Sequence, residues 1–306
     1  MIDLISVGKK FIERHGKDKA CEVTGKSIAF VNSWESGAKN PTVEDVQKML
    51  EFDPDPIHAV HPLYTNPELG KRLAILMVTN RAVQPATMES VIRIYDPAKM
   101  QFIRQTTNFL TRGRNQAAWK FLQSGCEWSL WVDDDMVLPC GDAAWFKSVC
   151  SAPNFPDTFA GLNTIGRLIY HKKTLVGGCY FNRTPTGKAQ FNEAALNREL
   201  DNAVHVSGPR NELRPTKWVA TGCMLVHRSV YEAIAKQNPS IQLDSEHERY
   251  LGYRYGFFDP LEPGMGEDVS FCLRAEKAGH QPYVDLALMP SHIGQMAYNY
   301  FNTKSL

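Results

Sequence analysis

The sequence predicts an α/β protein with a mainly parallel sheet sandwiched by helices, preceded by a small all-α domain. From residue 72 onward, apolar runs alternate with helical stretches, which is typical of strands and helices around a parallel sheet. The run "RLAILMV" has no polar alternation, as expected for a strand covered on both faces. Residues 53–71 hold four prolines and no sustained period, which indicates a linker. We therefore expect a helical segment over 1–52, a linker over 53–71 and the α/β domain over 72–306.

The elements of the α/β domain can be predicted in chain order. Strands are expected at 72–78, 128–132, 174–181, 218–227 and 281–288, and helices at 85–95, 114–124, 143–150, 229–236 and 268–278. Gly125 and Gly279 follow two of these helices, where glycine commonly ends a helix. The strand over 174–181 contains a glycine pair.

Three consecutive aspartates follow the predicted strand 128–132, in the stretch "WVDDDMVLP". The carboxyl end of such a strand is where open α/β folds bind ligands. Alternation of side chains places Asp133 and Asp135 on one side and Asp134 on the other, pointing into the scaffold. Two hard oxygen donors on one side suit Mg²⁺ or Mn²⁺. The alternative is a solvated acidic turn.

Two later stretches add candidate groups. "PGMGEDVSFCLRAEKAGH" places Glu267 and Asp268 at the start of a helix, where acidic residues are also ordinary. "MPSHIG" places His292 in a short loop after the predicted strand 281–288. Histidine is a common metal ligand, although a lone histidine is more often structural.

The order of these motifs resembles the GT-A (Rossmann-like) glycosyltransferases, in particular the inverting, family-2-like enzymes of bacteria and phages. The resemblance covers about residues 72–294 and rests on "WVDDDMVLP", "LVGGCYFNR", "VATGCMLVHRSVYEAI", "GEDVSFCLRAEKAGHQPYVD" and "SHIG" in this order. It implies a metal-dependent transfer of a sugar from a UDP-sugar. A retaining course stays open at this stage.

The resemblance also implies roles for single residues. Asp133, Asp135 and His292 would bind Mn²⁺ or Mg²⁺, which would neutralise the departing diphosphate. Asp268 would be the general base, and Glu267 would orient the acceptor or support Asp268. Gly222 would let backbone amides approach the substrates on the acceptor side. The residues placed at the donor are Thr79, Asn80, Arg81, Arg112, Arg114, Asn115 and Asp133.

The first 52 residues predict four short helices joined by glycine-bearing turns. Thr42, with Asp45 three residues later, is placed to cap the fourth helix. "SWESGAKNPTVEDVQKMLE" resembles the repressor-like (XRE) helix-turn-helix family, whose third helix enters the major groove of DNA. The residues that this resemblance places at DNA are Lys26, Ser27, Phe30, Asn32, Ser33 and Lys39. The alternative is a small helical bundle that packs on the larger domain or binds protein. Eight basic and eight acidic residues leave the segment neutral.

A further stretch, 158–192, has no acidic residue and interleaves cations with aromatics. Arg167, Tyr170 and Tyr180 are among them. This pattern suits a nucleic-acid groove, and equally a set of core aromatics with solvated cations.

A sugar-transfer domain joined to a DNA-reading domain suggests that the acceptor is DNA. A 5-hydroxymethylpyrimidine, hydroxymethylcytosine or hydroxymethyluracil, would supply the alcohol, as in phage DNA modification. Two alternatives stay open: a glycan or protein acceptor with a structural N-terminal domain, and a DNA-binding regulator that senses nucleotide-sugar.

A net charge of +1 gives no global attraction to nucleic acid. Without a membrane-length apolar run or a signal-peptide core we expect a cytoplasmic protein, in the host cytoplasm if phage-encoded, with no membrane partner.

Overall fold

The computed structural model describes residues 4–36, 38–42, 44–45, 48–49, 73–80, 82–95, 100–181, 208–294 and 297–298. The predicted linker and Arg81 lie outside the described residues. The domain boundaries therefore stay predictions.

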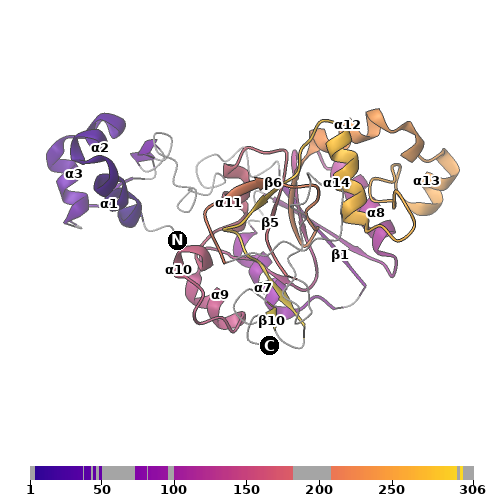
Figure 1. Cartoon of the computed structure of the whole chain (residues 1–306), viewed down its shortest axis with the longest axis horizontal. Coiled ribbons are helices and arrows are strands. Elements are labelled where there is room, and N and C mark those ends of the chain that lie inside the picture. The colour runs from indigo at the N-terminus through magenta and orange to yellow at the C-terminus, as the bar shows by residue number, and fades with distance from the viewer. Residues whose placement is uncertain are drawn as a thin grey trace.

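The described elements alternate between helix and strand after residue 72 (Figure 1). The helices are α1 Leu4–His15, α2 Lys17–Thr24, α3 Ile28–Glu35, α7 Pro85–Ile94, α8 Leu110–Gln123, α9 Ala143–Val149, α10 Asp157–Ala160, α11 Thr164–Tyr170, α12 Arg228–Gln237, η2 Pro239–Ile241, α13 Ser245–Leu251 and α14 Glu267–Lys277. The strands are β1 Leu73–Thr79, β2 Met100–Thr106, β3 Trp128–Val132, β4 Met136–Val137, β5 Leu175–Gly178, β6 Leu213–Pro215, β7 Cys223–His227, β8 Tyr283–Asp285, β9 Ser291–Ile293 and β10 Ala297–Tyr298.

A seven-stranded sheet forms the centre of the fold, with the order β2-β1-β3-β7-β5-β8-β6. Strands β2, β1, β3, β5 and β8 run in one direction, because β7 is antiparallel to both β3 and β5 while β8 is parallel to β5. Only β7 and the edge strand β6 run the other way among the described strands. The prediction of a mainly parallel sheet in an α/β fold is confirmed. A second, three-stranded sheet has the order β10-β9-β4.

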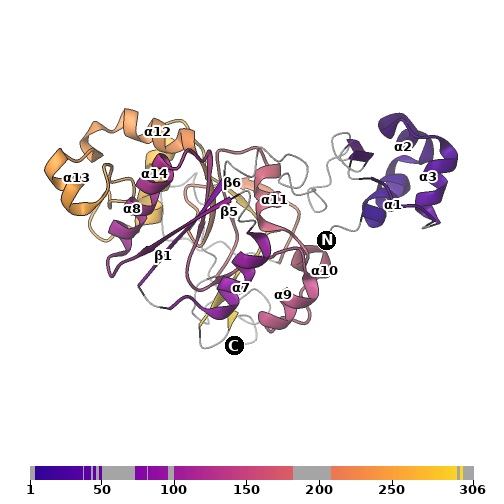
Figure 2. The same ribbon diagram turned by 180° about the vertical axis from the view of Figure 1, so that it is seen from behind.

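Helices cover both faces of the large sheet. In β1, Ala74, Leu76 and Val78 face a hydrophobic cluster that includes side chains of α8, α12 and α14. The alternate residues of β1 face a second cluster with α7 and α11. Figures 1 and 2 show these two groups of helices on opposite sides of the sheet. Every residue of β1 is buried, as the unbroken apolar run predicts.

The N-terminal helices have a hydrophobic cluster of their own, which is centred on the fully buried Trp34 of α3. The predicted cap of the fourth helix is confirmed. The Thr42 backbone N–H donates to the Asp45 carboxylate at 3.0 Å, and the Asp45 N–H donates to the Thr42 hydroxyl at 3.1 Å. This reciprocal pair satisfies two N–H groups at the start of the helix.

Several predicted boundaries were wrong. Helix α8 begins at Leu110, four residues before the predicted start, whereas β5 and β7 are shorter than the predicted strands. The edge strand β2 was not predicted, because its alternating exposure gives it no apolar run. The small sheet was also missed, since its strands are only two or three residues long.

Candidate active site at the carboxyl edge of the sheet

The three aspartates lie at the carboxyl end of β3, and each has a different partner. Asp134 is buried, and its carboxylate accepts a hydrogen bond of 2.5 Å from the Thr79 hydroxyl at the end of β1. The Asp134 carbonyl accepts from the Gln84 N–H at 2.9 Å. Asp134 thus joins two strand ends and points into the scaffold, as expected.

Arg114 of α8 holds two carboxylates at once. Its Nη2 donates to Asp133 Oδ1 at 3.0 Å, and its Nε donates to Glu267 Oε1 at 2.9 Å. The Arg114 side chain is only 3% exposed. Burial alone would lower the pKa of Arg114, but Asp133 and Glu267 outweigh burial and raise it. Arg114 is therefore a fixed cation that joins the end of β3 to the start of α14.

Asp268, next to Glu267, has no such ion-pair partner among the described residues. Its Oδ1 accepts only the N–H of its neighbour Val269, at 2.8 Å. Burial and the Glu267 charge raise the pKa of Asp268 to about 6, against the partial opposition of Arg114. A carboxylate with this pKa is ionised near neutral pH and binds a proton more readily than an ordinary aspartate.

His292 of β9 and Asp135 form a second pair. The His292 ring carries a proton on Nδ1, because this nitrogen lies 2.7 Å from the Phe181 carbonyl oxygen and must donate to it. This leaves Nε2 facing Asp135 Oδ1 at 3.6 Å. A carbonyl that fixes the ring in this way is the usual arrangement behind a metal-binding histidine. The pair fits a divalent cation that also takes oxygens from a bound phosphate and water.

The described residues contain no group of three or more His, Cys, Asp or Glu side chains that could hold a metal ion. Arg114 holds one carboxylate oxygen of Asp133, whereas Asp135 and His292 face each other. The set of Asp133, Asp135 and His292 stays a prediction, and Asp135 and His292 are the two members that the structure pairs.

Tyr180 lies between the two groups. Its hydroxyl accepts the Gly222 N–H at 2.8 Å, and its ring is perpendicular to the His292 ring at a centroid distance of 5.1 Å. Burial raises the pKa of Tyr180 well above its usual value, and the Asp133 and Asp268 charges raise it further. The Gly222 amide, predicted to serve the substrates, therefore binds Tyr180 instead.

Three predicted donor residues have structural roles. The Thr79 hydroxyl is bound to Asp134, as described above. Asn115 is fully buried and clamps the loop before α14, since its Nδ2 donates to Asp259 at 2.8 Å and its Oδ1 accepts the Phe258 N–H at 2.9 Å. Arg112 lies on another face of α8 from Arg114 and donates to the Tyr250 carbonyl at 3.2 Å. Of the predicted donor set, Asn80 is exposed, and its place at the donor stays a prediction.

Most residues predicted at DNA contact one another within the N-terminal helices. Ser27 caps α3, and the Ser33 hydroxyl donates to the Phe30 carbonyl at 2.5 Å. The Lys26 ammonium lies 3.5 Å from the buried Asp45 carboxylate, and the Lys39 ammonium lies 4.8 Å above the Phe30 ring. These side chains are partly used in holding the fold together. Asn32 is exposed.

The predicted groove of cations and aromatics at 158–192 is not formed by the residues that the structure describes there. Arg167 is buried and binds Asp285 through Nε at 2.5 Å and Nη2 at 3.0 Å. Tyr180 and Phe181 are buried. The two aromatics belong to the core, as the alternative interpretation expected, whereas Arg167 is a buried cation and not a solvated one.

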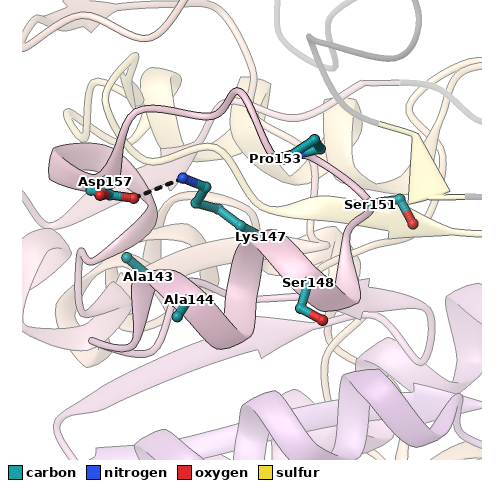
Figure 3. A pocket seen from close by; sticks show the side chains of 7 residues that line it. All are labelled: Ala143, Ala144, Lys147, Ser148, Ser151, Pro153 and Asp157. Atoms are coloured by element: carbon teal, nitrogen blue, oxygen red, sulfur yellow. Dashed lines mark hydrogen bonds and ion pairs between the residues drawn. The ribbon is translucent and has the colours of Figure 1, made fainter.

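The hollow shown in Figure 3 lies elsewhere. It is lined by Ala143, Ala144, Lys147, Ser148, Ser151, Pro153 and Asp157. The Lys147 ammonium pairs with the Asp157 carboxylate at 2.9 Å, as the dashed line marks. No predicted site residue lines this hollow, so the candidate site rests on the residues at the carboxyl edge.

Comparison with known proteins gives a distant structural likeness. No family model matches the chain, and no curated protein matches it. The structure of A197 from STIV matches with a TM-score of 0.43 and 12% identity, over 73% of this chain and 86% of that chain. A likeness at this level carries no argument about activity. No helix among the described residues is long and apolar enough to cross a membrane.

Proposed function

We propose that the protein transfers a sugar from a UDP-sugar to the hydroxyl group of a 5-hydroxymethylpyrimidine in DNA. The observation that supports this proposal most directly is the raised pKa of Asp268 together with its lack of an ion-pair partner among the described residues. It has a pKa of about 6 and stands beside two carboxylates that both pair with Arg114. A general base at neutral pH needs this combination of proton affinity and freedom from an ion pair.

The chain's own residues carry out the proton chemistry. Asp268 takes the proton of the acceptor hydroxyl as that O–H bond breaks. The acceptor oxygen forms a bond to the anomeric carbon of the sugar, and the bond from this carbon to the diphosphate oxygen breaks with its electron pair leaving on UDP. A single displacement of this kind inverts the anomeric centre. Arg114 holds Asp133 and Glu267 in place through its two hydrogen bonds, while Asp268 has no ion-pair partner among the described residues.

Asp135 and His292 would hold the Mn²⁺ or Mg²⁺. The bound cation would supply positive charge against the diphosphate. The free Nε2 of His292, fixed by the Phe181 carbonyl, and the Asp135 carboxylate are the two donors that support this assignment.

DNA as the acceptor rests on the N-terminal helices. Their sequence resemblance to a helix-turn-helix suggests a tether that raises the local concentration of DNA around the site. One observation favours the second candidate, a glycan or protein acceptor. Ser27, Ser33, Lys26 and Lys39 all have partners within the N-terminal helices, which leaves Asn32 as the more available contact.

One experiment separates these functions. The full chain is incubated with Mn²⁺, UDP-glucose, UDP-galactose or UDP-N-acetylglucosamine, and duplexes that carry cytosine, hydroxymethylcytosine or hydroxymethyluracil. The duplexes are then digested and the nucleosides are weighed. We expect a hexosyl mass gain on a hydroxymethylated base alone. UDP release that requires a glycan or protein would favour the second candidate, and UDP-sugar binding without turnover would indicate a nucleotide-sugar sensor.

A further inference from the structure

The hydroxyl of Tyr180 is a buried hydrogen-bond donor without an acceptor. The residue is 2% exposed, and its oxygen already accepts the Gly222 N–H at 2.8 Å. No residue that the structure describes accepts the hydroxyl proton. Buried hydroxyls are rarely left in this state. The proton is therefore available to a ligand.

Gly222 sets the position of this hydroxyl. A Cβ atom added at Gly222 would lie 2.5 Å from the Tyr180 oxygen, so any side chain would displace the phenol. The backbone N–H and the missing side chain together hold the hydroxyl at one place. Such close approach of backbone to a functional group is a common reason for glycine at a site.

Strand register brings the hydroxyl to the acid cluster. Val132 of β3 pairs with Cys223 of β7, so the residues next to them, Asp133 and Gly222, lie at the same end of the two strands. Arg114 then joins Asp133 to Glu267, the neighbour of Asp268. The charges of Asp133 and Asp268 both act on the phenol, which is consistent with this placement. Tyr180 and Asp268 thus border one site without a hydrogen bond between them.

A donor on one side and a carboxylate on the other select the group that can bind between them. An alcohol both accepts and donates a hydrogen bond, so it satisfies both partners. A phosphate oxygen only accepts, and it would be repelled by Asp268. A methyl group would leave both partners unsatisfied.

We propose that Tyr180 and Asp268 together hold the reacting hydroxyl of the acceptor, with Tyr180 donating a hydrogen bond to its oxygen and Asp268 accepting its proton. This inference rests on the proposed transfer reaction. As the proton leaves, negative charge grows on the acceptor oxygen, and the Tyr180 O–H is already placed to stabilise it. Tyr180 is then a substrate-binding residue that selects an alcohol.

The test uses Tyr180→Phe in the full chain with Mn²⁺ and the UDP-sugars named above. The variant keeps the ring beside His292 and removes only the hydroxyl. We expect transfer to hydroxymethylated DNA to fall about 10- to 100-fold in kcat/KM, with an unchanged Kd for UDP. Hydrolysis of the UDP-sugar without acceptor should fall as well, because water has the donor and acceptor character of an alcohol.

Tyr231→Phe is the matched control. Its hydroxyl is also fully buried and accepts the Trp131 Nε1–H at 2.7 Å, yet it belongs to the core beneath the site. It should lower Tm about as much as Tyr180→Phe and leave kcat/KM unchanged. Gly222→Ala is a second variant, which should reduce transfer by displacing the same hydroxyl.

The outcomes are distinct. Wild-type transfer by Tyr180→Phe would overturn the assignment while leaving the proposed function in place. A loss of UDP affinity together with a Tm drop beyond that of Tyr231→Phe would make Tyr180 structural, and would also overturn it. If Tyr180→Phe does not fold, an active Gly222→Ala variant with wild-type kcat/KM overturns it. A wild-type protein that neither transfers nor hydrolyses would overturn the proposed function, and this inference with it.

Discussion

Replacing Asp268 with asparagine should slow the reaction and stabilise the protein at the same time. Asparagine has nearly the same shape, and its side-chain oxygen can still accept the Val269 N–H that Asp268 Oδ1 accepts at 2.8 Å. Only the charge and the ability to take a proton are lost. The two effects have opposite signs because the charge that serves catalysis is unfavourable for folding.

The size of the stability effect follows from the pKa. The pKa of Asp268 rises from 3.8 to about 6 on folding, chiefly through burial and the Glu267 charge. Each unit corresponds to about 1.4 kcal/mol, so the ionised side chain costs up to about 3 kcal/mol. Partial solvent exposure reduces this to about 1–2 kcal/mol. Below pH ~4 the group is protonated in both states, and the cost grows as the pH rises to ~6, above which it is constant.

Two measurements check this reasoning. Urea unfolding of wild type and Asp268→Asn should give equal stabilities near pH 3 and a more stable variant above pH 6. Initial rates of sugar transfer by the wild type should rise about 10-fold between pH 5 and pH 7, because the ionised fraction of a group with a pKa of about 6 rises by that factor. The variant should lose at least ~100-fold in kcat.

Asp142→Asn is the control, because Asp142 also stands at a helix start, capping α9 through the Trp145 N–H at 2.9 Å. Asparagine caps helices as well as aspartate does, so stability and rate should both stay close to wild type. A fully active Asp268→Asn variant would refute the role of Asp268 as base. A variant less stable than wild type at pH 7 would refute the conclusion that the Asp268 charge is unfavourable for folding.

Three further substitutions test the surroundings of the base. Arg114→Met should cost about 3 kcal/mol of stability in urea unfolding, since it leaves two partly buried carboxylates without their cation. It should also move the rising limb of the pH–rate profile above pH 6, because Arg114 lowers the pKa of the base. An unchanged pH–rate profile would show that Arg114 does not lower the pKa of Asp268. His292→Ala should weaken Mn²⁺ binding at least ~10-fold by calorimetry. The control, alanine at the exposed His247, should leave Mn²⁺ binding unchanged. Equal Mn²⁺ affinities of wild type and His292→Ala would show that His292 is not a metal ligand. Asp285→Asn should destabilise the protein by about 3 kcal/mol at pH 7, because Arg167 loses its buried partner, and wild-type unfolding would contradict the pairing.

Local features of the sequence predicted local structure well. The unbroken apolar run at residues 72–78 predicted a doubly covered strand, and β1 is buried throughout. The capping pair of Thr42 and Asp45 depends on residues three apart, so it could be read from spacing. Asp134 was expected in the scaffold from strand alternation, and its bond to Thr79 confirms this.

The partners of the site residues could not be predicted, because they come from distant segments. Arg114 meets Asp133 and Glu267, which are 19 and 153 residues away in the chain. Sequence position suggested that Arg112, Arg114 and Asn115 serve one ligand together. On a helix, however, Arg114 points away from Arg112 and Asn115, and the three side chains have three separate sets of partners.

The three aspartates show how far composition can mislead about a metal. Consecutive carboxylates at a buried strand end suggest a cation that compensates them all. Asp134 instead accepts a hydrogen bond from the Thr79 hydroxyl, and Asp133 pairs with Arg114. Asp135 differs, because it faces His292 Nε2 at 3.6 Å while Nδ1 donates to a carbonyl. The case for Mn²⁺ or Mg²⁺ therefore rests on the third aspartate and its histidine.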